Sequence, residues 1–214
     1  MNRYMQYANE LKQTLDHLPW ATLEKIVARI HQTRVEGKQL FIMGNGGSAA
    51  TASHLACDLA KNINTSSYLR LRVMALTDNM PLFSAAANDL GYENVFTEQL
   101  TNWLQPNDVV LAISASGNSP NVLKAIKFAQ SRKATTIGWS GYNGGKLANL
   151  ADISLVVPNF SIEQIEDIHM IVAHMVTSEL RKISSEKIIL NGYQPKNELN
   201  GHATIIEHQS LMTS

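Results

Sequence analysis

The feature that most constrains the fold is an apolar strand, residues 109–113, that runs directly into a loop of hydroxyl side chains, residues 114–119. A continuous apolar and β-branched run of this length is typical of a strand buried on both faces of a parallel sheet. Pro120 is suited to the first position of a helix, and an apolar helical pattern follows it. The segment therefore predicts a strand, a tight loop and a helix in succession.

The loop has the composition of a phosphate-binding site. Ser114, Ser116 and Ser119 offer three hydroxyl donors, and Gly117 lets the backbone approach a ligand closely. The first N–H groups of the following helix point to the same place. Because the loop contains neither Lys nor Arg, it favours a small phosphomonoester over a polyphosphate. The alternative interpretation is an ordinary serine-rich turn.

A second loop repeats this order near the start of the chain. The short apolar run 39–43 ends in the glycine-rich turn 44–48, and an alanine-rich helical segment, 49–56, follows. The spacing is not G-x-G-x-x-G, which disfavours a dinucleotide site. Since the carboxyl ends of parallel strands meet at one edge of a sheet, we expect both loops to face one crevice.

The whole chain reads as an α/β fold. Five strands are expected, and they are Gln39–Met43, Leu71–Leu76, Val109–Ile113, Thr135–Trp139 and Ile153–Val157. Helical patterns separate them at about 48–63, 81–104, 119–132 and 144–150, and a closing helix covers Ile162–Ile183. An amphipathic opening segment from Tyr4 to Ile30 is interrupted at Pro19. We predict a doubly wound five-stranded parallel sheet preceded by helices, with one domain over 1–183 and an extension over 184–214.

Composition excludes several classes of protein. The 18 basic and 18 acidic side chains cancel, so the overall charge indicates neither a nucleic-acid nor a membrane partner. No apolar run approaches the ~18 residues of a membrane span, and the polar amino terminus lacks a signal peptide's apolar region. One cysteine, Cys57, fits a reducing compartment, and we expect it to be a small buried side chain. These features predict a cytoplasmic protein.

Four motifs in order resemble the sugar isomerase (SIS) domain and, within it, the phosphoheptose isomerase family. They are Gly44-Asn45-Gly46-Gly47-Ser48, Ala87-Asn88-Asp89, Ile113-Ser114-Ala115-Ser116-Gly117-Asn118-Ser119 and Ile165-Glu166-Asp167-Ile168-His169. The resemblance spans residues 1–183. It implies a homotetramer of flavodoxin-like subunits, with the amino-terminal helices in a central bundle and active sites at subunit contacts. It also implies conversion of sedoheptulose 7-phosphate into D-glycero-D-manno-heptose 7-phosphate, a precursor of surface polysaccharide such as lipopolysaccharide or capsule.

Ten residues of these motifs are predicted to contact the substrate. They are Asn45, Gly46, Gly47, Ser48, Asn88, Asp89, Ser114, Ala115, Ser116 and Ser119. From the residues alone, Asn88 and Asp89 fit equally well at the end of a helix next to Gly91, as part of its cap. The resemblance favours Asp89 facing the sugar.

Two pairs of side chains are spaced to hold a metal ion. His54 and Asp58 are four residues apart on one helix face, while Glu166 and His174 are eight apart and about 80° around the axis of theirs. These positions match those at which phosphoheptose isomerases carry His, Glu, Gln and His as zinc ligands. Two histidines and two carboxylates suit one Zn²⁺ or a similar ion. His169 fits a packed or hydrogen-bonded role as well as a functional one.

Two of these positions depart from the family. Asp58 replaces the Glu taken as metal ligand and base, and its carboxylate is drawn back by roughly 1–1.5 Å, enough to affect the rate. Glu166 replaces a Gln and adds a carboxylate. We favour Asp58 as the base and His174 as the acid, with Glu166 as the rival base. Two alternatives stay open: which of the two carboxylates is the base, and whether the substrate is that of the family.

Two other functions compete with the isomerase. A non-catalytic adaptor with the same fold needs no metal quartet, and the four matching positions argue against it. A sugar-phosphate sensor of this fold is usually joined to a DNA-binding module, and the sequence has no basic helix-turn-helix pattern.

Overall fold

The computed structural model describes residues 2–64 and 69–185 and confirms the predicted parallel sheet. The strand order is β2-β1-β3-β4-β5, which is the flavodoxin-like order. The strands are β1 (Gln39–Gly44), β2 (Arg72–Ala75), β3 (Val109–Ile113), β4 (Thr135–Ser140) and β5 (Ile153–Val156). Each lies within one residue of its expected bounds. The central strands β1, β3 and β4 are almost fully buried, as expected of strands covered on both faces, whereas the edge strands β2 and β5 are less buried.

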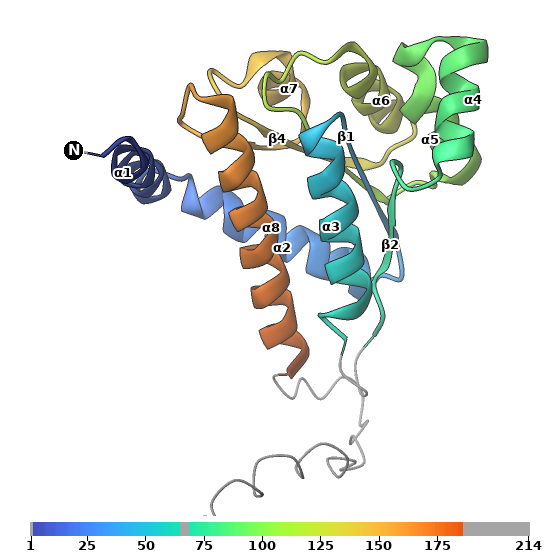
Figure 1. Cartoon of the computed structure of the whole chain (residues 1–214). Coiled ribbons are helices and arrows are strands. Elements are labelled where there is room, and N and C mark those ends of the chain that lie inside the picture. The colour runs from blue at the N-terminus through green and yellow to red at the C-terminus, as the bar shows by residue number, and fades with distance from the viewer. Residues whose placement is uncertain (1, 65–68, 186–214) are drawn as a thin grey trace, which may run out of the picture.

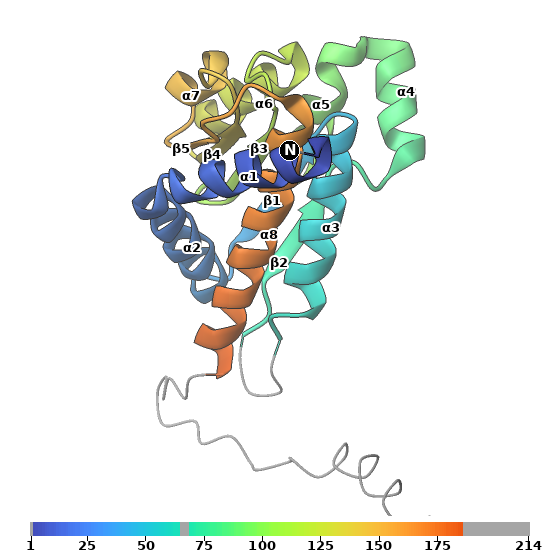
Figure 2. The same cartoon turned by 60° about the vertical axis from the view of Figure 1, so that its left-hand side comes forward.

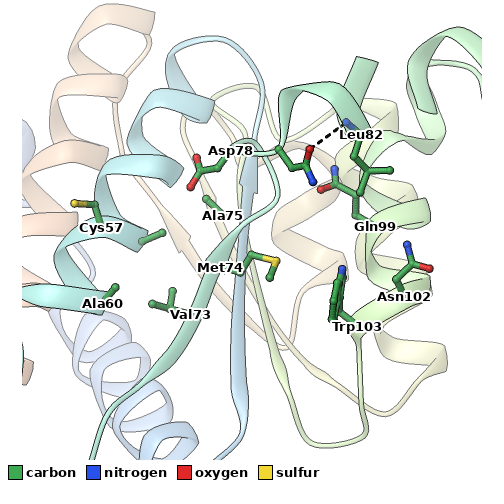
Figure 3. A pocket seen from close by; sticks show the side chains of 12 residues that line it. Cys57, Ala60, Val73, Met74, Ala75, Asp78, Leu82, Gln99, Asn102 and Trp103 are labelled. Carbon is green, nitrogen blue, oxygen red and sulfur yellow. Dashed lines mark hydrogen bonds between the residues drawn. The ribbon is translucent and has the colours of Figure 1, made fainter. Parts of the chain in front are cut away.

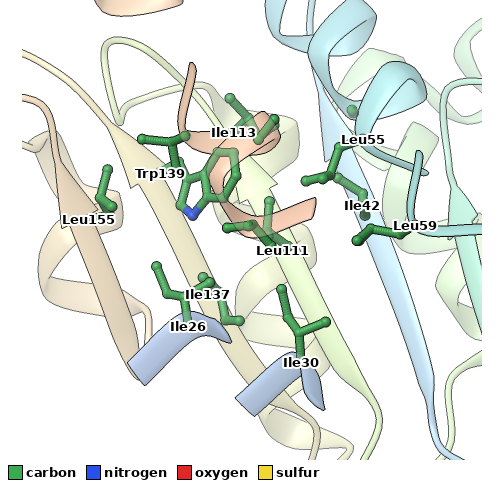
Figure 4. Packing of buried hydrophobic residues seen from close by; sticks show 14 of the residues in the cluster. Ile26, Ile30, Ile42, Leu55, Leu59, Leu111, Ile113, Ile137, Trp139 and Leu155 are labelled. Atoms are coloured by element: carbon green, nitrogen blue, oxygen red, sulfur yellow. The ribbon is translucent and has the colours of Figure 1, made fainter. Parts of the chain in front are cut away.

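Helices cover both faces of the sheet (Figure 1). One face carries α2 (Trp20–Val35), α3 (Gly47–Lys61) and α8 (Ile162–Ser185), and the other carries α4 (Met80–Leu90), α5 (Val95–Trp103), α6 (Pro120–Ser131) and α7 (Gly145–Leu150). Alternate strand residues feed the two cores: Leu40 and Ile42 of β1 join the first, and Phe41 and Met43 join the second. In the first core Trp139 is fully buried between β3 and β5 (Figure 4).

The opening segment forms two helices that differ in their burial. Helix α2 buries Ile26 and Ile30 against the sheet, whereas α1 (Arg3–Asp16) has Thr14 as its one buried residue. The break between them falls at Pro19, as predicted. Figure 2 shows α1 crossing in front of α8, and the hydroxyl of Tyr7 donates to Asp167 at 2.5 Å. Helix α1 therefore contacts the domain on one side and leaves its other side open.

The single helical pattern predicted over 81–104 is interrupted. Helix α4 ends before Gly91, and the 3-10 turn η1 (Tyr92–Asn94) leads into α5. Gly91 has a φ of 90°, a backbone conformation that few other residues adopt. The helix end at Gly91 agrees with the alternative interpretation of Asn88 and Asp89 as part of a helix cap, whereas the continuous helix over 81–104 is wrong.

The closing helix α8 begins at the predicted Ile162 and ends at Ser185. The predicted extension over 184–214 lies outside the described residues, apart from its first two. Within the described part of the chain, no helix is both long and apolar enough to cross a membrane.

Candidate active site

The two predicted loops lie side by side at the carboxyl ends of β1 and β3. These strands are neighbours, and Gly44 pairs with Ile113 at their ends. The first loop turns sharply, because a Cβ on Gly44 would lie 2.6 Å from the carbonyl oxygen of Ser48. Gly46 has a φ of 54°, and α3 begins at the next residue. The glycines thus direct the start of α3 toward the serine loop.

The hydroxyls of the serine loop are partly drawn together. The Oγ atoms of Ser114 and Ser119 are 3.1 Å apart, and Ser119 makes no capping bond to α6. Ser116 is exposed, and its Oγ accepts from the backbone N–H of Asn118. Ser48 is buried in the first turn of α3. Hydroxyl groups and the N-termini of α3 and α6 therefore lie near the carboxyl ends of β1 and β3. Neither loop contains Lys or Arg.

A pair of amides joins the two loops. The side chains of Asn45 and Asn121 donate to each other, and both distances are 2.9 Å. The hydroxyl of Tyr92 also donates to Asn45 Oδ1, at 3.1 Å. The side chain of Asn45, predicted as a substrate donor, is thus engaged within the protein. Neither Asn121 nor Tyr92 was predicted as a site residue; the one signal was that Asn121 lies two residues after the serine loop, in the first turn of α6.

Three of the four predicted metal ligands converge. His54 Nε2 lies 3.0 Å from His174 Nε2 and 3.4 Å from Asp58 Oδ2, and one ligand atom from each residue lies within 4.8 Å of the others. Helices α3 and α8, which carry them, run side by side (Figures 1 and 2). Ligands about 2.0–2.2 Å from a tetrahedral ion are separated by roughly 3.3–3.6 Å. The donor set therefore suits a divalent ion such as Zn²⁺, and the separation of His54 from Asp58 matches this range, whereas the two histidine nitrogens lie at hydrogen-bond distance and would move apart slightly to share an ion.

Glu166, the fourth predicted ligand, is not part of this group among the described residues. Its carboxylate lies against the glycine loop, where a Cβ on Gly47 would be 2.6 Å from either carboxylate oxygen. A carboxylate at the first residue of α3 is favoured by the partial positive charge of a helix N-terminus. Glu166 thus lies at the glycine loop, at the start of the helix that carries His54 and Asp58.

Three other predicted substrate residues make few hydrogen bonds to the two loops' side chains. Asn88 and Asp89 are exposed near the end of α4, and the Asn88 amide donates to Asp89 Oδ1 at 2.7 Å. Ala115 is buried, and its carbonyl accepts from the backbone N–H of Gly141. Gly141 belongs to the turn after β4, so this turn is hydrogen-bonded to the serine loop.

A separate pocket of about 450 Å³ lies at the open edge of the sheet, along β2 (Figure 3). It lies between α3 and α5, and its wall includes Cys57, Met74 and Trp103. Cys57 is exposed there, so the prediction that it is buried is wrong: it lies on the side of α3 that faces this pocket. The pocket shares no residue with the histidine cluster.

Known proteins resemble this chain over most of its length. Residues 3–141 match the family described as the SIS domain. The chain is 42% identical over 147 residues to a phosphoheptose isomerase of Rhodospirillum rubrum, covering 67% of this chain and 75% of that one. It is 34% identical over 152 residues to one from Aquifex aeolicus, covering 71% and 79%. A solved phosphoheptose isomerase from Francisella tularensis superposes with a TM-score of 0.77 at 26% identity, covering 85% and 96%.

Proposed function

We propose that this chain, which belongs to the SIS domain family and within it to the phosphoheptose isomerases, is a metal-dependent aldose–ketose isomerase that converts sedoheptulose 7-phosphate into D-glycero-D-manno-heptose 7-phosphate. The observation that carries the proposal is the convergence of His54, Asp58 and His174 on adjacent helices. Helix α3 joins this cluster to the glycine loop, so one site offers phosphate donors, a metal position and carboxylates.

The phosphate end of the substrate fits the serine loop. Ser114, Ser116 and Ser119 supply hydroxyls, and Ser48 adds one from the neighbouring loop. The N-termini of α3 and α6 supply backbone N–H groups and a positive partial charge. Neutral donors of this kind suit a phosphomonoester that has to leave again as product.

The reacting end of the sugar then lies toward α8. A divalent ion held by His54, Asp58 and His174 would polarise the oxygens on C1 and C2 of the sugar. In the direction from ketose to aldose, Asp58 takes a proton from C1 and returns a proton to C2, which passes the sugar through an enediolate. His174 gives a proton to O2, which becomes a hydroxyl, and takes the proton that O1 releases when it becomes the carbonyl oxygen of the aldose. Glu166 is the rival base, because its carboxylate lies at the glycine loop.

The direct test is to follow sedoheptulose 7-phosphate with the purified chain in deuterated water. We expect an aldose heptose phosphate to form with deuterium at C2, because the returned proton exchanges with solvent at the base. An unchanged substrate in the presence of Zn²⁺ would contradict the proposal and favour the adaptor.

Replacing Ser116 by Ala should weaken phosphate binding. The change removes one hydrogen bond to a charged group, about 1.5–3 kcal/mol, or roughly 10- to 150-fold in Kd. Calorimetry with inorganic phosphate measures it. Ser131→Ala is the matched control, because Ser131 is exposed at the other end of α6. A crystal soaked in sulfate that shows the anion elsewhere, with the serine loop empty, would refute this site.

Assembly as a homotetramer is part of the proposal. Tyr4 and Met5 of α1 are 83% and 60% exposed, and a second copy would bury them. Light scattering should give four times the mass of one chain at micromolar concentration. The double change of Tyr4 and Met5 to Glu should lower that mass, while Lys127→Glu on exposed α6 surface should not. A monomeric mass for the wild type would rule out the tetramer.

A further inference from the structure

The buried imidazole of His169 connects α8 to the sheet at a point close to the proposed active site. His169 is 1% exposed, and its Nε2 lies 3.2 Å from the carbonyl oxygen of Ser140, the last residue of β4. Its ring packs beside that of Trp139, with 6.2 Å between the ring centroids. No step of the proposed reaction uses this histidine.

The protonation state of His169 follows from its surroundings. Burial lowers its pKa to about 4, so the ring is neutral at neutral pH. Because a carbonyl oxygen only accepts, the proton of the neutral ring is on Nε2 and is donated to Ser140. Nδ1 then has no hydrogen-bond partner among the described residues. An unpartnered buried acceptor costs stability, so packing alone would be served better by an apolar side chain.

The carbonyl that His169 contacts belongs to the segment that supports the serine loop. The backbone N–H of Ser114 donates to the carbonyl of Trp139 at 2.9 Å, and that of Gly141 donates to Ala115 at 2.8 Å. Residues 139–141 therefore bond directly to the start of the serine loop. A shift of this segment relative to α8 changes the separation between the phosphate donors and the side chains on α8.

Helix α8 carries two of the proposed reacting groups on either side of His169. Glu166 lies three residues before it and His174 five residues after it. Apolar burial of neighbouring α8 residues such as Ile165 and Ile168 holds the helix on the sheet, but burial is not directional. A hydrogen bond is directional, so it selects one rotation and one axial position of the helix.

We infer that His169 is a positioning residue: by bonding to Ser140 it fixes α8, with Glu166 and His174, relative to the serine loop. The inference rests on the proposed function for its effect on turnover. A misplacement of about 1 Å at a reacting group can cost on the order of a hundredfold in rate. Supporting groups behind a metal ligand typically change metal affinity by about 10- to 100-fold.

The test compares His169→Leu, which cannot donate, with His169→Gln, whose amide can reach the carbonyl of Ser140. We expect His169→Leu to lower kcat by about 10- to 100-fold and to weaken Zn²⁺ binding by about tenfold, with binding of inorganic phosphate unchanged. His169→Gln should restore most of both. Thr177→Val is the matched control, because Thr177 is also buried on α8 but bonds only within the helix.

The inference is overturned if folded His169→Leu keeps the kcat and Zn²⁺ affinity of the wild type. It is also overturned if His169→Gln is impaired as strongly as His169→Leu. Should His169→Leu fail to fold, His169→Asn, whose amide is too short to reach Ser140, replaces it with the same expected losses. Failure of the proposed function gives a different result. The wild type would then not turn over substrate, but its Zn²⁺ affinity and that of His169→Gln would still exceed the affinity of His169→Leu.

Discussion

Asp58→Asn is expected to lower the turnover of sedoheptulose 7-phosphate by roughly 10²–10⁴-fold, the usual effect of removing a general base. The amide keeps the shape of the side chain but cannot accept the proton from C1. His54 and His174 remain as ligands, so we expect the ion to stay bound, although more weakly. Steady-state kinetics at saturating Zn²⁺, with metal content measured on the same sample, separate loss of the base from loss of the ion.

Glu166→Gln is the matched comparison, because it removes the same charge from the rival carboxylate. The Glu166 side chain lies against Gly47 and outside the cluster formed by the two histidines and Asp58. We therefore expect this variant to retain most of the turnover. If Glu166→Gln is the inactive variant and Asp58→Asn is not, the roles are exchanged, and the base acts from the glycine loop.

The central strands β1, β3 and β4 were predictable because they are buried on both faces. The run Val109–Ile113 contains no polar residue, so its apolar pattern is continuous. The glycine and serine residues of the loops after β1 and β3 mark where these strands end. The strand order followed from the family resemblance, and the structure confirms it. The helix end at Gly91 was anticipated only by the alternative interpretation of Asn88 and Asp89 as part of a cap.

The site was predictable only where one element carries the signal. His54 and Asp58 are four apart on one helix, so their convergence follows from helix geometry. The position of Glu166 depends on how α8 packs against α3, which no local pattern encodes. The bonds from Asn45 to Asn121 and from His169 to Ser140 likewise join segments distant in sequence. Contacts of this kind need the tertiary structure.

Removing the metal should abolish turnover and lower thermal stability together. The Nε2 atoms of His54 and His174 lie 3.0 Å apart, close enough for both to bind one ion after a small movement. An ion that binds only the folded chain adds about 2.7 kcal/mol of stability at a free concentration one hundred times its Kd. Dialysis against a chelator should therefore eliminate activity and lower the melting temperature, and added Zn²⁺ should restore both.

Variants of the ligands make this result specific to the cluster. His54→Ala and His174→Ala should each lose the bound ion at micromolar Zn²⁺, whereas His31→Gln on α2 should keep one ion per chain by elemental analysis. A chelated wild type that still turns over sugar phosphate would show that the carboxylates transfer the proton unaided. A wild type that binds no ion and turns over nothing would leave the adaptor as the better account, because an adaptor needs the fold and its exposed α1 surface but neither histidine.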